Sequence, residues 1–147
     1  MTQIVRYQKL DERAVTPTYG SAAAAGADLY AVMDEPLTLA PGETALVHTG
    51  LAVEIPDGFV GLVCARSGLA TKRGLAPANK VGVIDADYRG EILVALHNHG
   101  TAPQTIDHGE RIAQLVLVPF LTAAYEQADS LTDTVRGAGG FGSTGSK

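Results

Sequence analysis

The chain of 147 residues carries a formal net charge of −5 and a single cysteine, and these numbers already exclude several classes of protein. The length predicts one domain, and the acidic balance disfavours a non-specific nucleic-acid binder, which needs a basic surface. The lone Cys64 excludes an internal disulfide, as expected in a reducing cytoplasm, and no apolar run approaches the roughly 20 residues of a membrane-spanning helix. We therefore expect a cytoplasmic protein with neither a membrane nor a nucleic-acid partner.

Short apolar stretches dominate the chain before its C-terminal part. These stretches are Ala45–Val47, Leu51–Ile55, Phe59–Cys64, Val81–Ile84, Ile92–Leu96 and Ile112–Val118. Turn-forming pairs such as Pro41-Gly42 and His108-Gly109 separate them, because proline fixes φ and glycine accepts positive φ. Together with 17 glycines and 7 prolines in the chain, the pattern predicts an all-β sandwich or jelly-roll barrel.

Helical signals are weak, and the C-terminal end differs in composition from the rest. One helix of two turns is predicted over Ser67–Arg73, begun by the serine and ended at Gly74. Residues 136–147 contain five glycines and two serines, a composition typical of a flexible segment. The sequence therefore predicts a β domain over residues 1–128 and a flexible C-terminal arm over residues 129–147.

Arginine, serine and glycine at the end of an apolar strand outline an anion site. Arg66, Ser67 and Gly68 follow the stretch that ends at Cys64. The serine hydroxyl and the free N–H groups of a first helical turn would point at one place, glycine would admit a ligand closely, and arginine would supply charge. The alternative interpretation is an ordinary helix cap beside a surface arginine.

A second group of polar residues is centred on Asp85. Asp85 and Asp87 alternate with Ile84 and Ala86, so in an extended segment the two carboxylates would point the same way. A carboxylate flanked by apolar residues is partly desolvated, which makes Asp85 a candidate base for a water molecule. The alternative is a turn in which Asp87 and Gly90 only shape the backbone.

The glycine-rich C-terminal segment also holds residues suited to closing over a ligand. Arg136, Phe141 and the Ser143-Thr144 pair stand among its glycines. An aromatic ring can stack on a ligand, and guanidinium and hydroxyl groups can bind phosphates. No lysine precedes the serine–threonine pair, so the segment is not a P-loop. The alternative is a disordered tail.

Five short segments, taken in chain order, carry a resemblance to a known family. They are Gly26–Ala31, Arg66–Ala70, Gly82–Glu91 with the preceding Asn79, Arg111–Leu115 and Arg136–Gly145. In this order, and over nearly the whole chain, they resemble the motifs of the trimeric deoxyuridine triphosphate nucleotidohydrolases (dUTPases). The resemblance implies a jelly-roll-like (β-clip) subunit in a homotrimer. It also implies active sites built at subunit boundaries, each closed by the C-terminal arm of another chain.

The resemblance assigns residues around the base of the nucleotide. It implies that Asn79 and the backbone of Val83 and Ile84 read the uracil edge. Leu93 is implied as a further substrate contact, and Phe141 as the ring that covers the uracil.

The resemblance also assigns the reacting groups. It implies Asp85 as the carboxylate that activates water, and Tyr88 as the ring that packs under the deoxyribose and excludes a 2′-hydroxyl. The implied phosphate contacts are Arg66, Ser67, Gly68 and Gln114, joined by Arg136, Ser143 and Thr144 of the arm. Mg²⁺ is implied as the cofactor, held mainly by the triphosphate and water, with Asp28 supporting the metal and water region indirectly.

These implications give one expected function and two alternatives. The expected enzyme is a Mg²⁺-dependent dUTP diphosphatase that yields dUMP and pyrophosphate and so keeps uracil out of DNA. The alternatives are a dCTP deaminase of the same fold and a non-catalytic nucleotide-binding jelly-roll protein. A deaminase needs a base near C4 of cytosine, usually a glutamate, and Asp85 with the Phe141 arm fits the hydrolase better. Lys80 departs from the small or apolar residue expected after Asn79.

Overall fold

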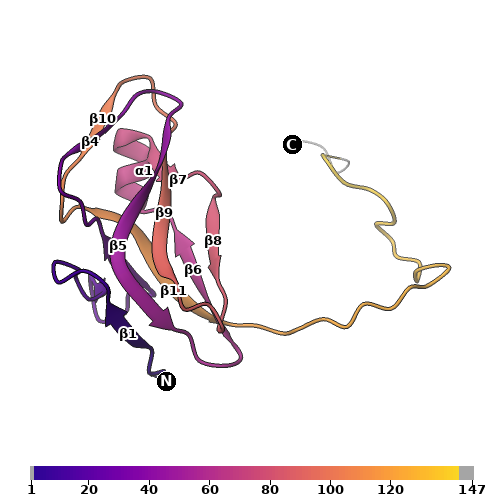
Figure 1. Cartoon of the computed structure of the whole chain (residues 1–147). Helices are drawn as coiled ribbons and strands as arrows, with labels where there is room; N and C mark the ends of the chain where they lie inside the picture. Colours follow the sequence, from indigo (N-terminus) through magenta and orange to yellow (C-terminus); the bar gives the residue numbers. More distant parts are fainter. Residues whose placement is uncertain (1, 143–147) are drawn as a thin grey trace.

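The computed structural model describes residues 2–142, and within them the chain forms eleven strands and one helix (Figure 1). The first strands are β1 (Arg6–Lys9), β2 (Thr18–Tyr19), β3 (Gly26–Tyr30), β4 (Leu37–Leu39) and β5 (Thr44–Glu54). The elements that follow are β6 (Phe59–Cys64), α1 (Ser67–Arg73), β7 (Leu75–Pro77), β8 (Val81–Ile84), β9 (Glu91–Asn98), β10 (Gln104–Ile106) and β11 (Arg111–Pro119). The predicted all-β class is confirmed.

Two antiparallel sheets make up most of the domain. One has the strand order β1-β5-β9-β7 and the other β2-β3-β11-β6-β8, while β4 and β10 form a separate pair. Strands far apart in the sequence are neighbours in both sheets, as jelly-roll-like connections require. In β11, Gln114 lies opposite Asp28 of β3 on one side and Cys64 of β6 on the other. This register brings three of the motif segments side by side.

Alternating residues of the strands form the core. In β9 the side chains of Ile92, Val94, Leu96 and Asn98 are buried, while those between them are more exposed, as the period of two in a strand requires. The largest fully buried apolar side chains are Leu29, Leu51, Ile55, Leu75, Ile92, Leu96, Ile106 and Ile112. Most of them come from the two large sheets and all belong to one cluster, so one core joins the two sheets and fixes the strands that carry the candidate site.

The strand β5 differs from the prediction of two separate strands. It runs without interruption through Thr49 and Gly50, where its pairing with β9 shifts register between His48 and Ala52. Gly50 has φ of 67°, which suits glycine and allows a bulge here in place of a turn. The Thr49 hydroxyl is buried and donates to the carbonyl of Ile92 at 2.7 Å, so the bulge stays attached to β9.

The helix α1 spans the predicted residues, but its N-cap differs from the prediction. Its N-cap residue is Arg66 rather than Ser67, and the Arg66 side chain makes no cap hydrogen bond. The first turn therefore keeps N–H groups that no helical carbonyl satisfies. The helix ends as predicted at Gly74, which has φ of 65° and donates its N–H to carbonyls of the last turn.

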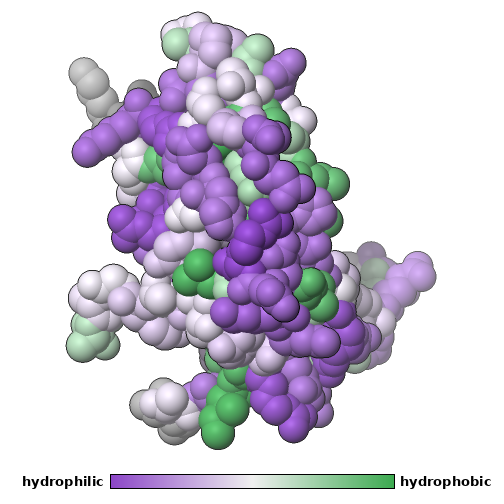
Figure 2. All heavy atoms as spheres, turned by 60° about the vertical axis from the view of Figure 1, so that its left-hand side comes forward, coloured by the Kyte–Doolittle hydropathy of each residue, from purple (hydrophilic) through white to green (hydrophobic). Residues whose placement is uncertain are grey.

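The chain leaves the β domain after β11. Residues 120–142 contain neither strand nor helix and run away from the domain as an extended segment (Figure 1). Leu121, Tyr125, Leu131 and Val135 are almost fully exposed in this segment. The surface drawn in Figure 2 is mainly hydrophilic, with apolar side chains in small separate groups. Among the described residues, no helix is long and apolar enough to span a membrane.

Asn98 is a buried polar residue at the end of β9. Its side-chain nitrogen donates to the carbonyls of Leu39 and Ala102, both at 2.9 Å, and its side-chain oxygen accepts from the N–H of Gly100 at 2.9 Å. The side chain is fully buried, so these three bonds replace the water that it loses on folding. Asn98 thereby fixes the turn after β9 against β4.

The variant Asn98→Ala is expected to lower the free energy of unfolding by roughly 3 kcal/mol, because buried backbone groups lose their partner. Urea denaturation measures this change. The exposed Gln8 of β1 provides the matched control, and Gln8→Ala should change the free energy by less than about 0.5 kcal/mol. A loss at Asn98 no larger than that of the control would contradict the assignment.

Candidate functional site

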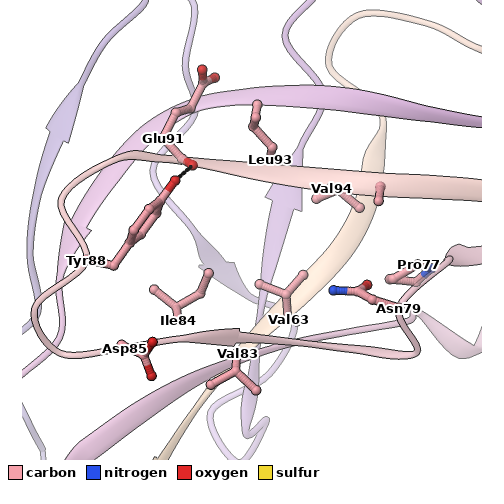
Figure 3. Close-up of a pocket in the computed structure, with 12 residues that line it drawn as sticks. Val63, Pro77, Asn79, Val83, Ile84, Asp85, Tyr88, Glu91, Leu93 and Val94 are labelled. Carbon is pink, nitrogen blue, oxygen red and sulfur yellow. Dashed lines mark hydrogen bonds between the residues drawn. The ribbon is translucent and has the colours of Figure 1, made fainter.

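A hollow of about 240 Å³ lies between β8 and β9, and we call it the base pocket (Figure 3). β8 is the edge strand of the five-stranded sheet, and β9 lies next to the edge of the other large sheet. The pocket is lined by Val63, Pro77, Asn79, Gly82, Val83, Ile84, Asp85, Tyr88, Glu91, Leu93, Val94 and Ala95. Every base and sugar residue predicted within the β domain is therefore in one place.

The base pocket combines apolar side chains with the polar groups of Asn79, Asp85, Tyr88 and Glu91. Val63 and Ile84 point into it, Val83 points away, and the Asn79 amide is directed inward (Figure 3). A side chain at Gly82 would place its Cβ 3.2 Å from Val63 and 3.4 Å from the Asn79 amide nitrogen, so glycine keeps this wall open. An amide and strand backbone beside apolar side chains suit a flat heterocycle with one hydrogen-bonding edge.

Asp85 follows β8 at the rim of the base pocket, and it is exposed in this chain. Residues 86 and 87 form a turn, in which the N–H of Tyr88 donates to the carbonyl of Asp85 at 3.1 Å. The expectation that Ile84 and Ala86 desolvate the carboxylate is wrong for the single chain. The physical reason is that the segment turns instead of continuing as a strand, so these neighbours do not cover the carboxylate.

Tyr88 closes one end of the base pocket. Its hydroxyl donates to the backbone carbonyl of Glu91 at 2.8 Å, and its ring lies next to Gly90 (Figure 3). Leu93, which is 37% exposed, lies on the neighbouring wall. Glu91 also lines the base pocket. It was not predicted as a site residue, although it is the last residue of the third motif.

A second and more open hollow, which we call the phosphate pocket, lies at the start of α1 and measures about 850 Å³. Its lining combines glycines with four basic side chains, namely Arg66, Lys72, Arg73 and Arg111. Ser67 and Gly68 are exposed at the start of the helix, and no atom lies within 4 Å of a Cβ built at Gly68. This arrangement of cations and free N–H groups suits an anion.

Asp28 organises the basic side chains of the phosphate pocket. The residue is only 8% exposed, and its carboxylate accepts from Arg66 Nε at 2.7 Å and from Arg111 Nη1 at 3.3 Å. Arg66 Nη1 also donates to the carbonyl of Arg111 at 3.5 Å. Sequence reasoning missed Arg111, although it is the first residue of the fourth motif.

Gln114 lies at the floor of the phosphate pocket. Its amide nitrogen donates to the carbonyl of Ala65 at 2.9 Å, which ties β11 to the start of the Arg66 segment. A Cβ at Gly26 would lie 2.1 Å from the Gln114 amide oxygen, so the first motif needs glycine at this position to admit the glutamine. The predicted phosphate residues of the β domain are therefore also in one place.

The two pockets share no lining residue. Arg136 and Phe141 belong to the extended segment, line neither pocket, and are exposed. Arg136 Nε donates to the carbonyl of Gly139 within that segment at 2.7 Å. Ser143 and Thr144 lie outside the described residues. One chain thus assembles two halves of the predicted site and does not bring them together with the arm.

Lys80 sits in a tight turn between β7 and β8. It has φ of 66°, and the N–H of Val81 reaches back to the carbonyl of Asn79 at 2.8 Å. The pKa of His99 is lowered by desolvation and also by the positive charges of Lys80 and His97. The Lys80 charge therefore acts on His99, and Lys80 is not part of the base pocket lining.

Comparisons with known proteins agree on one family. The dUTPase family model matches residues 12–145. The deoxyuridine 5′-triphosphate nucleotidohydrolase of Desulfitobacterium hafniense is 51% identical over 142 residues, which cover 96% of this chain and 94% of that protein. The dUTPase of Staphylococcus bacteriophage 80alpha, solved with dUpNHpp, superposes with a TM-score of 0.89 at 31% identity over 98% of this chain and 99% of that one.

A further solved structure concerns a metal. A mutant dUTPase from phage phi11 of S. aureus, which coordinates a structural Mg(II) ion, superposes with a TM-score of 0.79 at 28% identity over 87% of this chain and 98% of that one. The matches extend over nearly the whole sequence and include the jelly-roll-like fold. The chain therefore belongs to the dUTPase family and is a hydrolase that acts on deoxyuridine 5′-triphosphate.

Proposed function

We propose that this dUTPase hydrolyses dUTP to dUMP and pyrophosphate in sites shared between the subunits of a homotrimer. The observation that carries this proposal is the separation of the predicted residues into two pockets that share no lining residue. Each complete site takes its base pocket from one chain, its phosphate pocket from a neighbour, and its cover from the arm of another chain. The exposed apolar side chains of residues 120–142 support an arm that packs on another subunit.

In the base pocket, the apolar walls hold the uracil, and polar groups select its edge. The Asn79 amide and the backbone of Val83 and Ile84 form hydrogen bonds to the base, and Leu93 contacts the substrate from β9. The ring of Tyr88 lies under the deoxyribose, where it leaves no room or partner for a 2′-hydroxyl. Phe141 covers the uracil when the arm closes.

In the phosphate pocket, the triphosphate binds to Arg66, Ser67, Gly68 and Gln114. The Asp28 carboxylate supports this role because it holds the Arg66 guanidinium in place at 2.7 Å. From the arm, Arg136 and the Ser143-Thr144 pair bind the terminal phosphates. Closure excludes bulk water, which strengthens these charge interactions in the transition state.

The residues present fit Mg²⁺ in an indirect role. Among the described residues, no group of three acidic, histidine or cysteine side chains is arranged to hold a metal ion. Both oxygens of the Asp28 carboxylate accept from arginines, so Asp28 orients its surroundings rather than supplying a free ligand. Mg²⁺ bound to the triphosphate would neutralise phosphate charge.

The chemical step needs one base and one water molecule. Asp85 accepts a proton from the water while the water oxygen attacks the α-phosphorus. The bond between the α-phosphorus and the bridging oxygen breaks, and that oxygen leaves with the pyrophosphate. In the homotrimer, other subunits cover the exposed rim where Asp85 lies, so the water is held in one orientation toward the phosphorus. The lone thiol of Cys64 and a nucleotide substrate support a cytoplasmic location.

The variant Asp85→Asn tests the base. It should lose roughly 10² to 10⁴ in the rate of dUTP hydrolysis, the usual size of general-base assistance, and should still bind dUTP because the amide keeps the shape. Pyrophosphate release and calorimetric titration with a non-hydrolysable dUTP analogue measure the two quantities. Turnover near the wild-type rate would assign the base to another residue.

A mixing experiment tests the shared site. Asp85→Asn chains and chains that end before Arg136 are unfolded together at equal concentration and refolded, and mixed trimers are confirmed by mass. If base and arm come from different chains, about one site in four is complete, and activity per site should return to roughly a quarter of wild type. If each arm closed over its own chain's Asp85, no site would be complete and no activity would return.

The variant Asp28→Asn tests the organisation of the phosphate pocket. Its neutral amide no longer balances two guanidinium groups, so kcat/KM for dUTP should fall by roughly tenfold to a hundredfold through misplacement of Arg66. The control is Asp11→Asn, because Asp11 also pairs with an arginine, Arg13, which lowers the pKa of Asp11 to about 2, and it does not line the phosphate pocket. Equal losses in both variants would contradict a role for Asp28 in this pocket.

A further inference from the structure

The ring of Tyr88 lies against Gly90, so a side chain at residue 90 would collide with the ring. A Cβ built at Gly90 would lie 2.4 Å from the Tyr88 hydroxyl oxygen and 2.6 Å from the ring carbon that carries it. Gly90 is not among the residues with positive φ, so contact with the ring, and not backbone conformation, accounts for glycine here. The turn that carries Tyr88 is exposed, and the residue itself is 42% exposed. The ring position therefore depends on a few specific contacts.

Glu91 makes contacts in two opposite directions. Its backbone carbonyl accepts from the Tyr88 hydroxyl at 2.8 Å, while its carboxylate points away from the base pocket (Figure 3). One carboxylate oxygen accepts from the N–H of Gly50 at 2.8 Å, and the other lies 2.9 Å from Nδ1 of His48. Glu91 is thus a connection between the Tyr88 hydroxyl and the bulge of β5.

The β5 bulge is a firm anchor. Gly50 uses its N–H toward Glu91, and its carbonyl accepts from the N–H of Leu10 at 2.7 Å. A Cβ at Gly50 would lie 2.9 Å from the Cβ of Ala14, so the surroundings are closely packed. The buried Thr49 ties the same bulge to β9. Movement of the anchor would break several of these contacts together.

We propose that Glu91 is a positioning residue for sugar selection: its carboxylate bonds to the β5 bulge and so fixes the carbonyl that holds the Tyr88 hydroxyl, which sets the discrimination between dUTP and UTP. This role rests on the proposed placement of Tyr88 under the deoxyribose. Steric exclusion of one hydroxyl demands that the ring be held within a fraction of an ångström. Tyr88 would supply the excluding surface, and Glu91 would supply its position.

The experiment compares kcat/KM for dUTP with kcat/KM for UTP in matched variants. Glu91→Ala removes the bonds to Gly50 and His48, and the ratio of the two values should fall by about tenfold or more. Glu91→Gln keeps an acceptor for the Gly50 N–H and should retain a ratio within a few-fold of wild type. Thermal unfolding of each variant shows that the ratio is measured on folded protein.

Glu43→Ala provides the control. The Glu43 carboxylate also accepts from a backbone N–H, that of Ala40 at 2.7 Å, but it lines neither the base pocket nor the phosphate pocket. This variant should keep the wild-type ratio even where its melting temperature falls. If Glu43→Ala and Glu91→Ala lower the ratio equally, Glu91 acts through stability alone and its positioning role is overturned.

Tyr88→Ala separates the failure of this inference from the failure of the proposed site. If Tyr88→Ala narrows the preference for dUTP and Glu91→Ala does not, Tyr88 selects the sugar without Glu91, and the positioning role is wrong. If Tyr88→Ala leaves the preference unchanged, sugar selection lies elsewhere, and the proposed placement of Tyr88 fails first. If both single variants narrow the preference for dUTP, the ratio of kcat/KM values in the double variant should be no lower than in Tyr88→Ala, because Glu91 acts only through the ring.

Discussion

The buried carboxylate of Asp28 is the interaction on which the phosphate pocket depends. It joins β3 to the segment after β6 through Arg66, and to the start of β11 through Arg111. Two guanidinium groups at one place would repel each other, so a shared anion is what allows both to stand at the same pocket. The register of β11 between β3 and β6 brings the three side chains within reach, and the core fixes that register. The strand order therefore positions the pocket, and residues of loops and of α1 complete its lining.

The base pocket follows the same principle with a different anchor. The ring of Tyr88 belongs to an exposed turn. The contacts that hold this ring pass through Glu91 to a bulge in the neighbouring strand β5. In the phosphate pocket the Asp28 carboxylate holds Arg66 directly, whereas in the base pocket the Glu91 carboxylate bonds to the β5 bulge and the Glu91 carbonyl holds Tyr88. A β-sandwich with short turns can present mobile side chains precisely enough for recognition when each is tied back to a strand in this way.

Much of the fold follows from local sequence, while the anchors do not. Apolar stretches, the Ser67–Arg73 helix and its end at Gly74 are set by neighbours in the chain, and they appear where they are predicted. Asp28 bonds to Arg66, which is 38 positions away in the chain, and to Arg111, which is 83 positions away. These bonds can therefore be found only once the strand order is known. The same holds for β5, because the apolar stretches Ala45–Val47 and Leu51–Ile55 are predicted apart, whereas the structure joins them in one strand through a bulge at Gly50. Local pattern cannot separate a turn from a bulge at this position, because a glycine with positive φ suits either.

The exposure of Asp85 bears on the proposal that the site is shared between chains. Apolar neighbours in sequence predict a shielded carboxylate, but the turn after β8 leaves it in solvent. A water molecule at an exposed carboxylate exchanges with bulk water and has no fixed direction of attack, whereas a general base gains its effect from a positioned partner. The walls that position the water must then come from outside the base pocket. The extended C-terminal segment adds no strand to the described fold and presents exposed apolar side chains, so it has the properties of such a wall. Shielding of Asp85 and closure of the arm would thus be one event, which confines the reactive state to the time when substrate is bound.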